Sequence, residues 1–174
     1  HSRASIAARP VAIASAGFGA QSLAQAPAGT VERISVHGPS LAGNLVGDDP
    51  ARTVFVYLPP SYASELERRY PVVYFLHGYT ATAEAYVRLL ELPQAADAAI
   101  ANGAAETIIV LPDAFTAYSG SMYSSSPTTG DWETYIADDL VTYVERNYRT
   151  LAQRASRGLA GHSMGGYGTI RIGM

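Results

Sequence analysis

Residues 161–165, Gly-His-Ser-Met-Gly, restrict the possible fold more than any other stretch of the chain. They follow a short apolar run at 158–160 and precede residues 167–174, which have the pattern of a starting helix. Glycines two positions before and after a serine suit a sharp turn between strand and helix, because they remove bulk that would collide with neighbouring backbone. We therefore predict a nucleophile elbow, which holds the Ser163 hydroxyl clear of the backbone.

The same turn would also prepare a site for negative charge. The helix that begins after Ser163 would point its first N–H groups toward the place where an oxyanion forms. The pentapeptide is short, and glycine and serine are common in this chain, so a glycine-rich turn without chemistry is the alternative. The strand before it, the helix after it and a matching motif upstream favour the elbow.

Composition limits the other classes of function. A chain of 174 residues with 48% apolar and 16% charged residues suits one globular domain. The net charge of −3 gives no reason to expect nucleic acid or an anionic membrane surface as a partner. The sequence has no cysteine, no histidine pair with the spacing of metal ligands, and no apolar run long enough to span a membrane. We therefore expect no cofactor and no metal site.

The first 26 residues differ in composition from the rest. Two arginines precede a stretch of small residues at 11–20, and the small residues at 22–26 are placed as a signal peptidase requires. This pattern predicts a signal-like segment over residues 1–26 and a secreted or periplasmic protein. A flexible, alanine-rich N-terminal segment, with the protein in the cytoplasm, is the alternative. Residues 27–174 then form one incomplete domain.

From residue 31 onward, strand patterns alternate with helix patterns. The first two strand patterns surround a turn at 47–50 and predict an antiparallel hairpin, which an extended run at 41–46 prolongs. The next two are almost wholly apolar, as in strands that helices cover on both faces. The sequence thus predicts an α/β fold with a mostly parallel sheet and an N-terminal antiparallel hairpin. We expect strands at 31–36, 53–58, 70–76, 108–111 and 157–160, and helices at 83–90, 95–101 and 132–148.

The expected helices have recognisable ends and faces. Thr82 and Asp131 are suitable N-caps for two of them, and Pro93 is expected to separate the first helix from the second. Apolar residues of the third helix recur every four positions and predict one stripe that faces the core. Its members are Trp132, Ile136, Leu140 and Val144. Trp132 is therefore expected in the core and not at a substrate site.

Four blocks of the chain resemble one group of enzymes. The blocks are residues 70–79 (YPVVYFLHGY), 109–113 (IVLPD), 132–135 (WETY) and 157–168 (RGLAGHSMGGYG). They are similar to the esterase D / antigen 85 branch of the α/β-hydrolases, which includes feruloyl esterases, acetylxylan esterases, S-formylglutathione hydrolases and mycolyltransferases. The resemblance covers residues 31–174 and implies an α/β-hydrolase fold. The blocks are specific for the family and not for one substrate.

The resemblance implies roles for three residues. Ser163 matches the nucleophile, and the backbone N–H groups of Tyr79 and Met164 match the two oxyanion donors. Together they imply hydrolysis of carboxylic esters through a Ser163 acyl-enzyme, with a small-molecule or polysaccharide-linked ester as substrate. Acyl transfer to a sugar, as in the mycolyltransferases, and a non-catalytic carbohydrate-binding relative are the alternatives.

The catalytic triad is not complete in this sequence. A serine needs a general base, and in this fold the acid and then the histidine follow the nucleophile along the chain. Here all four histidines precede Ser163 and no acid follows it. We therefore expect an α/β-hydrolase domain truncated after the elbow, with the missing C-terminal half of the same enzyme as its partner. Alone, it would expose a sheet edge and would be unstable or associate with that half.

The other polar candidates have simpler explanations. We expect a ring nitrogen of His77 to hold the predicted oxyanion loop by a hydrogen bond. His162 occupies the variable position of the elbow and is expected to be a packing residue, whereas His37 is expected at the surface of the hairpin. Asp113 ends a strand, where a carboxylate is usually a turn or cap residue.

A long loop at 117–130 is rich in Tyr, Ser, Thr and Gly. Long loops within compact domains often serve a function. Tyr118 and Tyr123 are therefore candidates to border an acyl or sugar pocket, although an exposed tyrosine-rich loop needs no ligand to exist.

Overall fold

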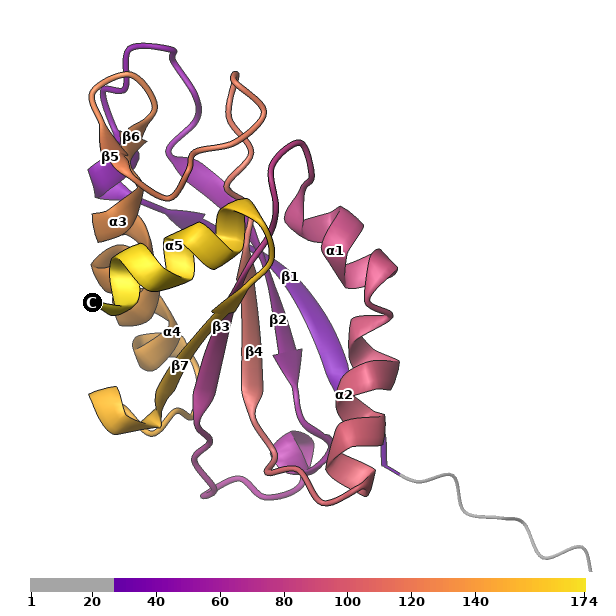
Figure 1. Cartoon of the computed structure of the whole chain (residues 1–174). Helices are drawn as coiled ribbons and strands as arrows, with labels where there is room; N and C mark the ends of the chain where they lie inside the picture. The colour runs from indigo at the N-terminus through magenta and orange to yellow at the C-terminus, as the bar shows by residue number, and fades with distance from the viewer. Residues whose placement is uncertain (1–26) are drawn as a thin grey trace, which may run out of the picture.

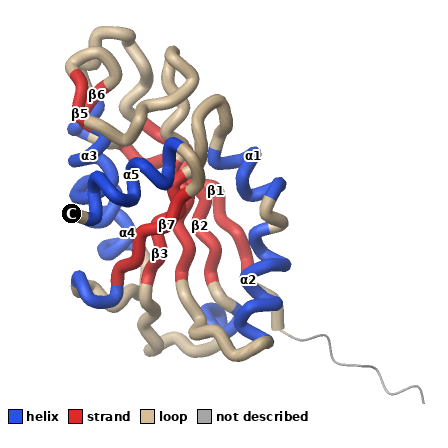
Figure 2. The backbone as a smooth tube through the Cα atoms, viewed as in Figure 1, coloured by secondary structure: helices blue, strands red, loops and turns tan. Residues whose placement is uncertain are grey.

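The computed structural model describes residues 27–174 of the chain. The predicted signal-like segment, residues 1–26, lies outside the described residues. A five-stranded sheet runs through the described part, and helices pack on both of its faces (Figures 1 and 2).

The sheet joins an N-terminal hairpin to a parallel region, in the strand order β1-β2-β4-β3-β7. β1 pairs antiparallel with β2, and β2 pairs antiparallel with β4, whereas β3 pairs in parallel with both β4 and β7. The predicted hairpin and α/β fold are confirmed, in a sheet that is mixed because β2 joins β4 antiparallel. The strands span Thr30–His37 (β1), Ala51–Leu58 (β2), Val72–Leu76 (β3), Ile108–Pro112 (β4) and Arg157–Gly161 (β7).

Helices form a layer on each face of the sheet. α1 and α2 cover one face, and α3, α4 and α5 cover the other (Figure 1). The α-helices span Ala83–Leu89 (α1), Leu92–Ala101 (α2), Trp132–Thr134 (α3), Val141–Asn147 (α4) and Met164–Gly173 (α5). Short 3-10 helices lie at Pro39–Leu41, Pro60–Ala63 and Arg154–Ser156, and two-residue strands at Ser125–Ser126 (β5) and Gly130–Asp131 (β6). Within residues 27–174, no helix is both long enough and apolar enough to cross a membrane.

The ends of the helices test the predicted caps and the predicted role of Pro93. Thr82 and Asp131 each accept a hydrogen bond from the backbone N–H three residues later, at 3.2 and 3.1 Å, so both predicted caps are confirmed. The prediction for Pro93 is wrong, because this residue lies in the first turn of α2, where a missing N–H costs nothing. The chain instead turns between the two helices at Glu91, whose φ is 44°.

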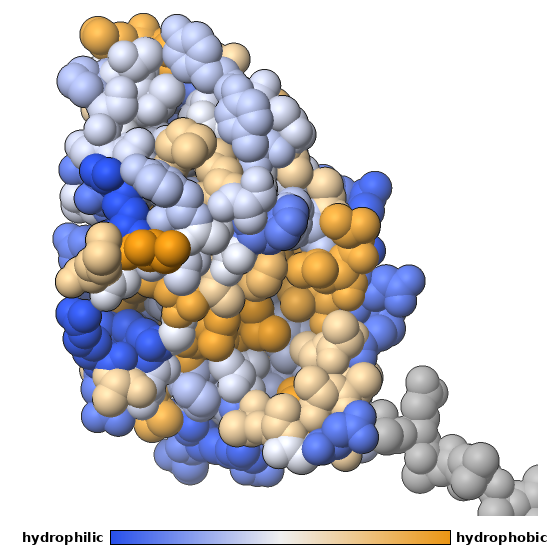
Figure 3. Space-filling model, viewed as in Figure 1, coloured by the Kyte–Doolittle hydropathy of each residue, from blue (hydrophilic) through white to orange (hydrophobic). Residues whose placement is uncertain are grey.

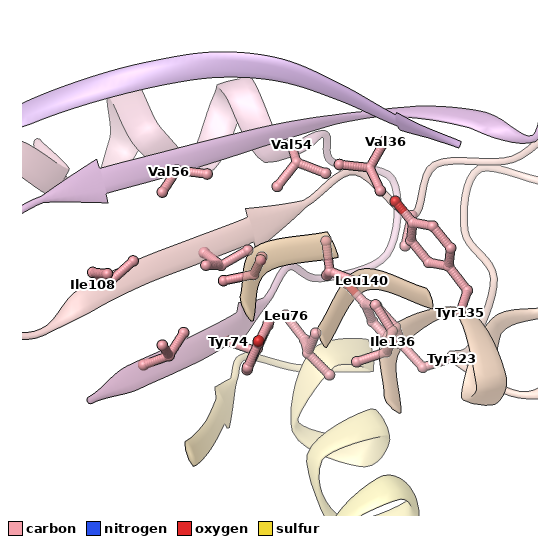
Figure 4. Close-up of a cluster of buried hydrophobic side chains, with 14 of the residues drawn as sticks. Val36, Val54, Val56, Tyr74, Leu76, Ile108, Tyr123, Tyr135, Ile136 and Leu140 are labelled. Carbon is pink, nitrogen blue, oxygen red and sulfur yellow. The ribbon is translucent and has the colours of Figure 1, made fainter. Parts of the chain in front are cut away.

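The larger core lies between the sheet and the α3–α4–α5 layer. Alternate residues of β3 point into it, and Val72, Tyr74 and Leu76 are at most 2% exposed. α3 continues through a π-helical segment at Tyr135–Leu140 into α4, so the predicted helix at 132–148 is confirmed. Figure 4 shows side chains of the strands and of this helix meeting in the cluster. The predicted stripe, Trp132, Ile136, Leu140 and Val144, is at most 1% exposed, and Trp132 is a core residue.

The predicted extended run at 41–46 is wrong. The chain there forms the 3-10 helix Pro39–Leu41 and a series of turns. The Asn44 amide donates to the carbonyl oxygens of Leu41 and Asp48, at 2.9 and 2.7 Å, and accepts from the Asp48 N–H at 2.9 Å. These local bonds to the side chain of Asn44 take the place of a strand ladder.

Part of the sheet remains uncovered beside β7. Val73 and Phe75 of β3 are half-buried on the face that α1 and α2 cover only in part. Figure 3 shows apolar surface there, over the strands between α5 and the α1–α2 layer. Within the described part, β7 pairs only with β3, so its second edge has no strand partner there.

α5 approaches the end of β3 so closely that only glycine fits between them. A Cβ atom at Gly165 would lie far inside van der Waals distance of the Leu76 carbonyl oxygen. At the next position, Gly166, the nearest atom to such a Cβ would be the Gly161 carbonyl oxygen at 3.6 Å, which is an ordinary contact. The two adjacent glycines are therefore not equivalent.

This difference predicts opposite effects of the same substitution. Gly165→Ala should lower the free energy of unfolding by at least about 2 kcal/mol, because the new methyl group meets backbone that cannot rotate away. Gly166→Ala should leave it unchanged or raise it by up to about 1 kcal/mol, because alanine is the better helix former. Urea denaturation of both variants measures the difference, and equal effects would contradict the packing described here.

Candidate active site

Ser163 lies at the junction of β7 and α5, with its side chain in reach of solvent. β7 ends at Gly161, α5 begins at Met164, and Ser163 is exposed. Its backbone has φ 54° and ψ −115°, a conformation that residues with a side chain rarely adopt. The turn is fixed by the His162 N–H, which donates to the Leu76 carbonyl at 3.2 Å. The chain therefore holds this serine in a strained turn at the carboxyl end of the sheet.

The β3–α1 loop passes directly beside Ser163. A Cβ atom at Gly78 would lie 3.4 Å from the Cβ of Ser163, so the loop backbone is within contact distance of the serine. Tyr79 follows Gly78, and Met164 follows Ser163. Among residues 27–174, neither the Tyr79 N–H nor the Met164 N–H has a hydrogen-bond acceptor. The structure thus brings together Ser163, Tyr79 and Met164, the three residues that the sequence singled out.

The 117–130 loop holds the β3–α1 loop from the side. The Thr80 N–H donates to the Ser119 carbonyl at 2.9 Å, and the Tyr79 hydroxyl donates to the Tyr118 carbonyl at 2.8 Å. A Cβ atom at Gly120 would lie 2.6 Å from the Tyr79 ring and 2.7 Å from the Met164 sulfur. The loop therefore contacts both residues whose N–H groups lack an acceptor.

Tyr118 and Tyr123 of this loop have different roles. Tyr118 is 58% exposed and Tyr79 is 51% exposed, so both rings are available to a ligand. Tyr123 is fully buried beneath Gly168 of α5, and its hydroxyl donates to the His77 carbonyl at 3.2 Å. Tyr123 therefore supports the site from below and does not border a pocket.

Backbone strain is concentrated around the same place. Of the six residues other than glycine with positive φ in the described part, five lie in the three segments that meet here. Such conformations persist only where the surrounding structure holds them, and they are frequent at functional sites. The five are Thr80, Ser119, Met122, Tyr123 and Ser163.

His77 is a buried structural residue, as the sequence predicted. Its Nε2 accepts a hydrogen bond from the Ala114 N–H at 2.8 Å, which leaves the proton on Nδ1, and Nδ1 donates to the Gly78 carbonyl at 2.9 Å. Burial lowers the pKa of the imidazole below its usual value of 6.5. Asp113 lies 3.8 Å away and accepts from the Phe115 N–H at 2.9 Å, which is the turn-capping role expected of it.

The other predictions for histidines give one correction. His162 is exposed and is not the packing residue that the sequence predicted. Its Nδ1 lies 2.6 Å from the Tyr86 hydroxyl, a contact that no sequence signal indicated because the two residues are 76 positions apart. His37 is exposed at the end of β1, as predicted. Within residues 27–174, no histidine is hydrogen-bonded to the Ser163 hydroxyl, and no group of three or more potential metal ligands is present.

The buried, neutral state of His77 predicts a pH dependence. Unfolded His77 takes up a proton near pH 6.5, whereas the folded state resists it, so the free energy of unfolding should fall as the pH drops below that value. The contribution is at most about 1.4 kcal/mol per pH unit. In His77→Gln, which cannot titrate, the loss between pH 7 and pH 5 should be smaller than in the wild type. Parallel curves for the two proteins in urea denaturation would contradict this assignment.

Comparison with known proteins agrees with the geometry. A family model described as "Putative esterase" matches residues 49–173. Esterase Rv1288 of Mycobacterium tuberculosis is 34% identical over 130 residues, which are 74% of this chain and 26% of that protein. The endo-1,4-beta-xylanase/feruloyl esterase of Xylanibacter ruminicola is 29% identical over 126 residues, which are 70% of this chain and 17% of that protein. The chain thus spans about a quarter or less of these relatives.

Solved structures give the same result. A ferulic acid esterase superposes with a TM-score of 0.73 at 28% identity, over 84% of this chain and 53% of that one. The ferulic acid esterase AmCE1/Fae1A of the anaerobic fungus Anaeromyces mucronatus has a TM-score of 0.65 at 25% identity, over 84% and 54%. An S-formylglutathione hydrolase of Agrobacterium tumefaciens shares the fold, with a TM-score of 0.63 at 21% identity, over 85% and 54%. The chain has an α/β-hydrolase fold and belongs to the esterase family whose model it matches.

Proposed function

We propose that this chain contributes the nucleophile and the oxyanion donors of a serine esterase that hydrolyses carboxylic esters. The observation that supports this best is the strained, exposed Ser163 beside two backbone N–H groups without acceptors in the described part. An anion forming next to Ser163 would provide an acceptor for both groups. Membership of the esterase family points to the same chemistry.

In the proposed reaction, the Ser163 hydroxyl oxygen attacks the ester carbonyl carbon and loses its proton to a general base. The carbonyl oxygen becomes an oxyanion, to which the Tyr79 and Met164 N–H groups donate hydrogen bonds. The intermediate collapses, the C–O bond to the alcohol breaks, and the protonated base gives its proton to the leaving alcohol. Water then attacks the acyl-serine by the same route and releases the carboxylic acid.

We propose that the base and its supporting acid come from elsewhere in the enzyme. No histidine in the described part is hydrogen-bonded to the Ser163 hydroxyl, so we assign the base to sequence outside residues 27–174. One edge of β7 has no strand partner within residues 27–174, and this edge and the apolar surface beside it suit a further segment of the same protein, packed against the sheet (Figure 3). Solved relatives of which this chain covers only 53% and 54% support this arrangement.

We further propose an ester of an aromatic acid with a polysaccharide as the substrate. Two related structures are of ferulic acid esterases, and one relative is a xylanase/feruloyl esterase. The exposed rings of Tyr79 and Tyr118 lie at the site and would stack on an aromatic acyl group or on a sugar. A polysaccharide substrate and the signal-like residues 1–26 together favour an exported protein.

A fluorophosphonate probe tests the proposed nucleophile. The probe reacts rapidly only with a serine that a base activates, so the full-length protein that contains this chain should be labelled at Ser163. Ser163→Ala should abolish labelling and lower kcat for a feruloyl ester by at least about 1,000-fold. Ser64→Ala changes an exposed serine that is far from Ser163 in the sequence, so this variant should retain both the labelling and the wild-type kcat. Equal labelling of Ser163→Ala and wild type would exclude Ser163 as the nucleophile.

A further inference from the structure

Tyr86 of α1 reaches across the site to the elbow. Its hydroxyl lies 2.6 Å from the Nδ1 of His162, the residue before Ser163. Tyr86 is only 7% exposed, and its ring packs against the rings of Phe75, His77 and His162 at centroid distances of 6.1, 6.0 and 6.0 Å. Packing of the ring therefore helps to fix the position of the Tyr86 hydroxyl, in addition to its hydrogen bond.

The hydrogen-bonded pair also encloses Gly78. A Cβ atom there would lie 2.6 Å from the Tyr86 hydroxyl, 3.4 Å from His162 Nδ1 and 3.4 Å from the Cβ of Ser163. The Tyr86 hydroxyl, His162 and Ser163 thus all pack against the same side of the Gly78 backbone. The next N–H along the chain is that of Tyr79, one of the two proposed oxyanion donors. Movement of the pair would therefore change the distance between that donor and Ser163.

The β3–α1 loop needs such support because its backbone is strained. Thr80 has φ 64°, and the loop is also held by the Thr80–Ser119, Tyr79–Tyr118 and His77–Gly78 hydrogen bonds. These bonds join the loop to the 117–130 loop and to itself, and none of them joins it to His162 or Ser163. The Tyr86–His162 hydrogen bond joins α1, which follows the loop, to the residue before Ser163. A backbone hydrogen bond from the His162 N–H to the Leu76 carbonyl joins the elbow to the strand that precedes the loop. Catalytic donors must be placed to within a fraction of an ångström.

We infer that Tyr86 and His162 are positioning residues, whose mutual hydrogen bond sets the Tyr79 N–H at its working distance from Ser163. The catalytic part of this inference rests on the proposed function. Neither side chain is assigned a contact with the substrate, so both would act on catalysis only through the Tyr79 N–H. The position of the loop itself does not depend on that function. A test therefore needs one readout of catalysis and one of the loop.

Tyr86→Phe removes the hydroxyl and keeps the ring that packs against its neighbours. In the full-length protein, this change should lower kcat for a feruloyl ester about 10-fold or more with little change in KM, because the oxyanion exists only after binding. The matched control is Tyr148→Phe, which loses a hydroxyl bonded to Glu32 at 2.8 Å at the other end of the sheet. The control should retain the wild-type kcat.

Two His162 variants show whether the hydroxyl acts through this histidine. His162→Ala should reproduce the loss in kcat, whereas His162→Asn, which keeps a polar atom near the Nδ1 position, should restore part of it. The double variant Tyr86→Phe/His162→Ala should be no slower than the slower single variant, because both remove the same bond. Independent, additive losses would contradict a common role.

Hydrogen–deuterium exchange of the backbone at 78–82 gives the readout that needs no activity. Tyr86→Phe should speed exchange in this segment, and Tyr148→Phe should not. An unchanged kcat, or unchanged exchange in 78–82, would overturn the inference. A wild-type protein without esterase activity would contradict the proposed function, and the exchange measurement would then decide the role of the pair by itself.

Discussion

The contact between α5 and the end of β3 is the constraint on which the rest of the site depends. Because Gly165 has no side chain, the helix begins directly against the Leu76 carbonyl, and the chain must leave β7 through a very tight turn. That turn forces Ser163 to positive φ and exposes its side chain. The same geometry leaves the Met164 N–H at the start of the helix, where no preceding carbonyl of the helix can accept it.

The β3–α1 loop, which carries Tyr79, is held in place by buried polar groups. His77, at the end of β3, accepts a hydrogen bond from the Ala114 N–H, in the segment that follows β4. The His77 carbonyl accepts a second one from the hydroxyl of Tyr123, which belongs to the 117–130 loop. A buried polar group is costly unless it is hydrogen-bonded, so these residues fix the loop at a single position. The Tyr86–His162 hydrogen bond adds a side-chain connection between α1, at the end of this loop, and the elbow.

The sequence predicted the elements whose signals are local. Apolar runs predicted the strands of the sheet, and capping residues predicted where two helices begin. The stripe of apolar residues at every fourth position predicted the long helix, and the glycine spacing predicted the turn at Ser163. It failed at 41–46, where the bonds of Asn44 to nearby backbone override an extended pattern. The contact of Tyr86 with His162 could not be predicted, because in the sequence Tyr86 looks like any other residue on the buried face of a helix.

The most direct test of the account is a crystal structure of the full-length protein after reaction with a phosphonate ester. We predict a covalent bond from the Ser163 hydroxyl oxygen to phosphorus, with one phosphonyl oxygen at about 2.7–3.1 Å from both the Tyr79 and the Met164 nitrogen atoms. An adduct on another residue, or a phosphonyl oxygen that contacts neither N–H group, would contradict the account.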